Sequence, residues 1–134
     1  MIASVLQLFL WIWFLGCVTT YRLGKVLLVE GMGIRSAEFV MLVLYTLGAA
    51  AFRFLGAAGK WILFAVLVLW FTVQFFCHWR YTLFGASPKK IEGYNDCFRG
   101  TARLFPERGD RLVPDLYHIV LHVLILVNIV FCLL

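Results

Sequence analysis

The order of apolar and polar residues divides the chain into long apolar runs separated by polar connections. The runs cover residues 2–21, 37–56, 61–79 and 113–134. A run of about 20 residues is about 30 Å long as an α-helix, which matches the hydrocarbon core of a bilayer. The pattern therefore predicts an all-α, polytopic integral membrane protein. We expect one transmembrane domain over residues 1–134, built as a four-helix transmembrane bundle.

The connections set how these helices follow one another. Residues 22–36 are polar and contain glycines, which permit turns. Residues 56–60 are too few for anything but a tight turn, so the second and third helices should be antiparallel neighbours. The second run carries small residues at 48–51, where a neighbouring backbone can approach closely.

The third connection is the only substantial one, and its middle has a helical period. Between about residues 89 and 105 one face carries the apolar side chains Ile91, Tyr94, Phe98, Ala102 and Phe105. The opposite face carries Lys90, Asn95, Asp96, Arg99 and Arg103. This predicts an amphipathic helix lying in the membrane interface between the third and fourth spans. It is either a docking surface for another protein or an ordinary membrane-bound connection.

Composition supports the membrane class. The chain is 63% hydrophobic and 14% charged, whereas a soluble domain has roughly 25% charged residues. The net charge is +5, but the basic residues flank apolar runs, so no nucleic-acid partner is expected. The four cysteines form no Cys-x-x-Cys pair, so neither a disulfide framework nor a zinc ribbon is indicated.

The distribution of lysine and arginine predicts the orientation. The first and third connections lie on one side and hold ten basic residues, namely Arg22, Lys25, Arg35, Arg80, Lys89, Lys90, Arg99, Arg103, Arg108 and Arg111. The opposite side has Arg53 and Lys60. The positive-inside rule then places the 80–112 loop in the cytoplasm and both termini outside. The expected location is the plasma membrane, as in the cytoplasmic membrane of a bacterium.

The fourth run contains the densest set of ionisable side chains. Asp115, His118 and His122 are spaced i, i+3 and i+7, so a helix places them on one stripe. His78, which ends the third run, is expected at the same depth, and Gln74 precedes it by one helical turn. All three histidines of the chain should therefore meet at the cytoplasmic edge.

Three interpretations of this set remain open. His78, His118, His122 and Asp115 are candidate metal ligands, for a site of the three-histidine zinc type or the two-histidine, one-carboxylate iron type, and the cofactor would be a transition metal or haem. Alternatively, His118 or His122 acts as a catalytic base oriented by Asp115. In the third interpretation the histidines make only structural hydrogen bonds, for example to Gln74.

The functional hypotheses follow from the same features. A chain of 134 residues leaves no soluble catalytic domain, so we expect a small membrane subunit or accessory protein that acts through helix packing and its interfacial segment. The alternative is a metal- or haem-dependent membrane enzyme or carrier that uses the cytoplasmic histidines. The sequence leaves open whether the protein is an enzyme. The expected partners are the lipid bilayer and either another membrane protein or a second copy of the chain.

Overall fold

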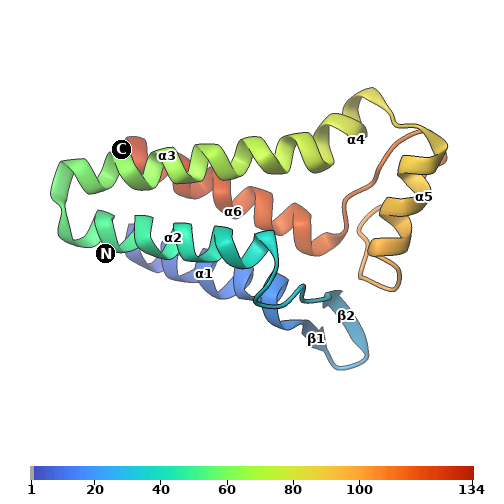
Figure 1. The fold of residues 1–134 in the computed structure, drawn as a ribbon, viewed down its shortest axis with the longest axis horizontal. Helices are drawn as coiled ribbons and strands as arrows, with labels where there is room; N and C mark the ends of the chain where they lie inside the picture. The colour runs from blue at the N-terminus through green and yellow to red at the C-terminus, as the bar shows by residue number, and fades with distance from the viewer. Residues whose placement is uncertain (1) are drawn as a thin grey trace.

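The computed structural model describes residues 2–134, and residue 1 lies outside the described part (Figure 1). The elements are α1 (Ile2–Thr19), β1 (Tyr21–Leu23), β2 (Val26–Val29), α2 (Ala37–Phe54), α3 (Gly56–Gln74), the π-helical segment η1 (Phe75–Trp79), α4 (Arg80–Phe84), α5 (Pro88–Cys97) and α6 (Leu116–Leu133). The described chain has four helices long and apolar enough to cross a membrane. The third of these runs without interruption through α3, η1 and α4.

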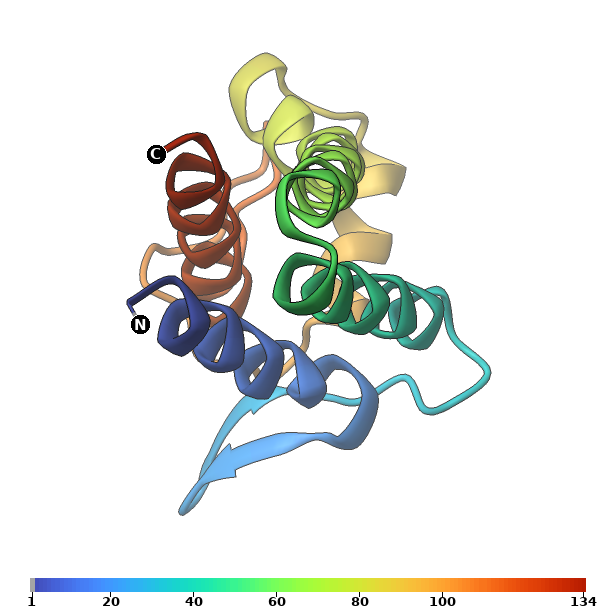
Figure 2. The same cartoon turned by 90° about the vertical axis from the view of Figure 1, so that its left-hand side faces the viewer.

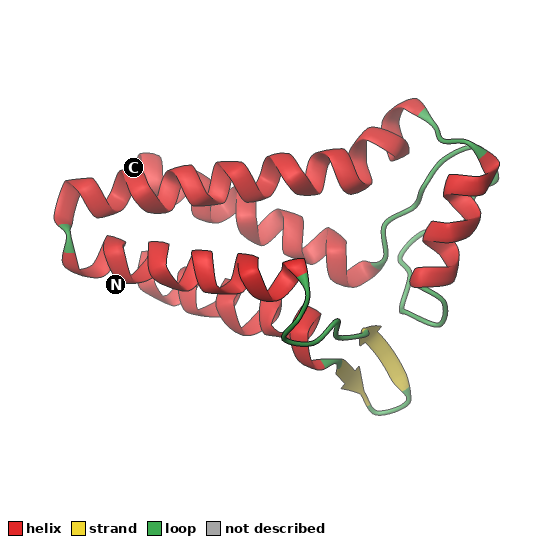
Figure 3. Cartoon of the chain, in the orientation of Figure 1, coloured by secondary structure: helices red, strands yellow, loops and turns green. Residues whose placement is uncertain are grey.

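The four long helices lie side by side, and each packs against two neighbours in the order α1, α2, α3, α6 (Figure 2). Aromatic side chains fill the centre, where the ring centroids of Phe14 and Trp70 are 4.1 Å apart and those of Tyr45 and Trp70 are 5.5 Å apart. Both termini and the α2–α3 turn lie at one end. The β-hairpin and α5 lie at the other end (Figure 3).

The α2–α3 turn is tighter than the sequence suggested. The chain reverses direction at Leu55 and Gly56, and Gly56 has a φ of +56°. Residues 57–60 therefore join α3, which begins at Gly56 rather than at the expected Trp61. A Cβ atom on Gly59 would lie 1.8 Å from the carbonyl oxygen of Ala51, so only glycine allows the two backbones to approach this closely.

The third long helix also extends further than expected, to Phe84 instead of Trp79. Charge at Arg80 ends the apolar run but does not end a helix, since arginine is a good helix former. The helix ends only at Gly85, whose φ is +82°.

An antiparallel hairpin, β1–β2, occupies part of the first connection, where only a polar turn-forming segment was expected. Its two-residue turn contains Gly24, with a φ of +61°. The segment after β2 then returns to the end of α1. There the backbone N–H groups of Met32 and Gly33 donate to the carbonyl groups of Cys17 (2.8 Å) and Val18 (3.1 Å). The connection thus caps α1, which satisfies carbonyl groups that a helix end leaves unpaired.

The predicted amphipathic helix over 89–105 is shorter than expected. It ends at Cys97, and Gly100, with a φ of +82°, redirects the chain. The next residues bond to the hairpin instead, because the N–H of Ala102 donates to the carbonyl oxygen of Leu27 at 2.8 Å. Ile91 and Tyr94 are buried as the period predicts, whereas Phe105 is 57% exposed and does not share their face.

The fourth helix starts at Leu116, three residues later than the predicted start at residue 113. Pro114 lies before the helix rather than in its first turn, and a proline disfavours helical geometry in the residue that precedes it. Asp115 is the N-cap, and its side chain accepts a hydrogen bond from the N–H of His118 at 2.9 Å.

Candidate functional site

The structure brings the side chains of His78, His118 and His122 together. Their ring centroids are 4.7 Å apart for His78 and His118, 5.4 Å for His78 and His122, and 6.3 Å for His118 and His122. His78 comes from η1, and the other two come from the first turns of α6. All three are at least 93% buried. This set lies at the hairpin end of the long helices.

Asp115 and His118 form a buried pair. The Oδ1 atom of Asp115 accepts from the backbone N–H of His118 and from its Nδ1 atom, at 2.9 and 2.7 Å. A carboxylate only accepts hydrogen bonds, so Nδ1 carries the proton and Nε2 of a neutral His118 holds a lone pair. Asp115 is fully buried, and its Oδ2 atom has no hydrogen-bond partner among the described residues. The pair therefore combines an oriented imidazole with an unsatisfied carboxylate oxygen.

His122 uses both ring nitrogens within the protein. Trp79 donates from Nε1 to Nδ1 of His122 at 2.7 Å, and Nε2 of His122 lies 3.0 Å from Oε1 of Gln74. Since an indole N–H can only donate, Nδ1 is the acceptor and the proton is on Nε2. Coordination of a metal by His122 would require breaking one of these two bonds. This geometry supports a structural role for His122.

His78 is held by α5. Its Nδ1 atom lies 2.6 Å from the hydroxyl oxygen of Tyr94. Burial, aided by the charge of Asp115, raises the pKa of Tyr94 above its ordinary value, so the hydroxyl stays protonated near neutral pH. Phe98 lies beside the same set, with its ring centroid 4.9 Å from that of His118 and 6.1 Å from that of His78. The end of α5 thus covers His78 and His118.

Sequence reasoning missed three parts of this arrangement. Trp79 was not linked to the histidines, whereas its indole N–H donates to His122. Tyr94 and Phe98 were placed on an apolar face, without a link to the histidines. The π-helical turn that carries His78 was not expected, because such a turn has no simple sequence signature; π turns inside α-helices occur frequently at functional sites.

The donor set does not form a ready metal centre. Within residues 2–134, no group of three or more histidine, cysteine, aspartate or glutamate side chains is arranged to hold a metal ion. The Nε2 atom of His118 and the Oδ2 atom of Asp115 have no protein hydrogen bond there, whereas both nitrogens of His122 are engaged. The metal and haem assignments therefore stay predictions.

Other polar side chains link the long helices. Asn128 donates from Nδ2 to the carbonyl oxygen of Leu124 in its own helix (2.9 Å) and to that of Leu6 in α1 (3.4 Å). The hydroxyl of Tyr117 donates to the carbonyl oxygen of Trp13. These bonds satisfy buried polar groups and fix α6 against α1.

Comparison with protein-family models, with curated proteins and with solved structures finds no match in any of the three.

Proposed function

We propose that this chain is a small integral membrane protein whose four long helices form a transmembrane bundle, and that it serves as an accessory subunit of a membrane assembly. The length and apolar character of the four helices support insertion. Their interior is closed by aromatic packing and by hydrogen bonds between buried polar groups.

The orientation follows from charge and from the arrangement of the elements. The termini lie at the end with few basic residues, and the hairpin and α5 lie at the end with many (Figure 1). The positive-inside rule then favours termini outside and residues 80–112, with the histidine set beside them, on the cytoplasmic side.

The observation that carries the accessory role is the exposure of large apolar side chains at the end with the hairpin and α5, in the connections and at the last residue of the third long helix. They include Leu23 (68% exposed), Met32 (67%), Ile34 (72%), Phe84 (80%), Leu104 (58%) and Phe105 (57%). Exposed apolar surface outside the hydrocarbon core marks contact with a protein or with the lipid interface. We assign it to contact with another membrane protein.

A photo-crosslinking residue at Phe84 tests this assignment. In intact membranes it should give a discrete crosslinked species that contains a second protein. The same residue at Val123, which is 53% exposed in the middle part of α6, should crosslink to lipid and give no protein adduct. Lipid adducts alone at both positions would contradict the accessory role.

A second candidate function is acid–base or metal chemistry at the histidine set, in a membrane enzyme or carrier. It is favoured by the buried Oδ2 atom of Asp115, which lacks a partner beside the oriented ring of His118. Ionisable groups buried at membrane depth often mark functional sites. Metal analysis and a visible absorption spectrum of the purified protein test it. Stoichiometric metal or a haem band that is lost in His118→Ala would support it, and a protein free of both would remove the metal and haem forms.

A further inference from the structure

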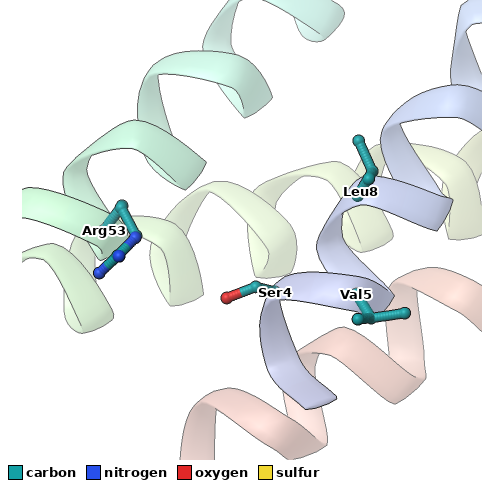
Figure 4. Close-up of a pocket in the computed structure, with 4 residues that line it drawn as sticks. All are labelled: Ser4, Val5, Leu8 and Arg53. Carbon is teal, nitrogen blue, oxygen red and sulfur yellow. The ribbon is translucent and has the colours of Figure 1, made fainter. Parts of the chain in front are cut away.

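A groove runs between α1 and α2 near the end that holds the termini. It consists of two adjoining hollows of about 490 and 390 Å³, and Ser4 and Leu8 line both. The outer hollow, which is nearer the termini, is completed by Val5 and by Arg53 of α2, which lies on the other side of the gap from Ser4 (Figure 4). The groove opens on the outer surface of the two helices, where a membrane-inserted bundle meets lipid.

Arg53 brings an uncompensated positive charge to the mouth of the groove. Its side chain is exposed, and among the described residues it makes no ion pair. The only carboxylate on its helix is Glu38, in the first turn, at the opposite end from Arg53. The mouth is therefore suited to an anion.

The inner part of the groove holds a polar side chain without a partner. Gln7 is 91% buried and lines the inner hollow. Its backbone carbonyl accepts a bond from the hydroxyl of Tyr45 at 3.0 Å, but its side-chain amide makes no hydrogen bond within residues 2–134. The bond from Nε1 of Trp11 to Oγ1 of Thr46, at 2.9 Å, bridges α1 and α2 here, and both residues line the inner hollow. An amide in this position can pair with a ligand that enters the groove.

We propose that the groove binds one phospholipid with an anionic head group. Its phosphate pairs with the guanidinium of Arg53 and the hydroxyl of Ser4, and an ester group accepts a hydrogen bond from the amide of Gln7. The upper part of an acyl chain packs on Leu8 and Ala49. Ser4 and Trp11 are seven residues apart, about 10 Å along a helix, so the groove spans the depth from head group to upper chain. This inference rests on the membrane insertion proposed above.

Lipid binding to the purified protein in detergent tests the proposal. Phosphatidylglycerol and phosphatidylcholine with identical chains would be titrated while the thermal unfolding midpoint and lipid retention in native mass spectra are measured. The parent protein should bind phosphatidylglycerol more tightly than phosphatidylcholine. Arg53→Gln should weaken that binding about tenfold, because one charge-assisted hydrogen-bonding group is lost. Glycerol phosphate should not stabilise the protein, which separates a lipid ligand from a free phosphate.

Two further variants make the outcome decisive. Lys60→Gln removes the other basic residue on the same side and should leave the preference unchanged. Ala49→Phe should fill the inner hollow and weaken the binding of both lipids, although Arg53 is still present. The proposal would be overturned if Arg53→Gln and Lys60→Gln lowered the affinity for phosphatidylglycerol equally, or if neither lowered it. Loss of lipid selectivity leaves membrane insertion standing, whereas release of the protein from membranes by alkaline carbonate would refute the insertion itself.

Discussion

The three buried histidines differ in how many of their ring nitrogens are already bonded. Both nitrogens of His122 are used by Trp79 and Gln74, whereas His78 and His118 each use one, with Tyr94 and Asp115. Three histidines at the same depth therefore differ in how many ring nitrogens can bind another partner. His122 holds α6 against the third long helix, and His78 and His118 keep a nitrogen for other partners.

His122→Ala should be clearly destabilising. It removes two hydrogen bonds and leaves the indole N–H of Trp79 without its acceptor in a part-buried site. The expected loss of unfolding free energy in detergent is about 2–4 kcal/mol. The matched control is Val123→Ala on the exposed side of the same helix, where a change within about 0.5 kcal/mol is expected. Equal effects of the two variants would show that the His122 bonds do not form.

Asp115 should be replaceable by asparagine as a cap but not by alanine. Asparagine also accepts a hydrogen bond from the N–H of residue 118, so Asp115→Asn preserves the start of α6. Asp115→Ala should cost about 1–2 kcal/mol through loss of the cap. Chemical denaturation monitored by circular dichroism measures both. If Asp115→Asn lowers the unfolding free energy as much as Asp115→Ala does, the negative charge of the carboxylate, rather than the cap, stabilises the start of α6.

The sequence predicted which residues meet and offered Gln74 and Asp115 as partners of the histidines, but it did not predict the bonds to Trp79 and Tyr94. Periodicity placed Asp115, His118 and His122 on one stripe, and topology placed His78 at the same depth. The indole of Trp79 and the hydroxyl of Tyr94 could not be assigned, because their partners depend on the π turn and on the path of the chain between α4 and α5. Both depend on tertiary contacts that local patterns do not encode.

At the level of elements, the contact between α2 and α3 depends on small residues. Gly59 faces the backbone at Ala51, and Gly48 packs on Leu63, where an added Cβ would lie 3.4 Å from Cδ1. The small residues at 48–51 were recognised in the sequence as a packing surface. The start of α3 was placed too late, at residue 61 instead of Gly56, because the sequence does not show that Gly56 turns the chain whereas Gly59 lies inside the helix.

Gly59→Ala should therefore separate α2 from α3. The added methyl group clashes with the Ala51 carbonyl, and we expect a loss of about 2–3 kcal/mol or failure to fold. Gly93→Ala in α5 is the control, because a Cβ there meets nothing within 4 Å. That variant should be neutral or more stable by about 0.5–1 kcal/mol. Thermal unfolding of both proteins in detergent measures the two effects. A Gly59→Ala protein as stable as the parent would contradict the close approach of the α2 and α3 backbones.

α5 is expected to depend on its apolar face. Phe98 packs on Tyr94 and on the rings of His78 and His118, while the side chain of Arg99 is 81% exposed. Phe98→Asp should release the segment and increase its proteolysis in inside-out vesicles well above that of Arg99→Asp. Equal cleavage of the two variants would mean that α5 does not cover the histidines.

On the scale of the whole molecule, charge and shape divide the protein into two unlike ends. One end has the termini, a tight turn and the groove beside Arg53, and the other has the hairpin, α5, the buried histidines and exposed apolar side chains. The four helices and the charge bias could be predicted because both follow from local composition. The hairpin and the path of residues 98–115 could not, because they are fixed by long-range bonds such as that from Ala102 to Leu27.

The proposed membrane orientation is tested most directly by finding the side of the membrane on which α5 lies. Cys97 is exposed, so a variant that keeps this cysteine and replaces Cys17, Cys77 and Cys132 reports its location without a new residue. An impermeant thiol reagent applied to intact cells should leave Cys97 unlabelled and should label it after permeabilisation. In a cysteine-free variant, a cysteine added after Leu134 should be labelled in intact cells. Labelling of Cys97 from outside, at the level of the added C-terminal cysteine, would contradict the proposed orientation and remove the histidine set from the cytoplasmic side.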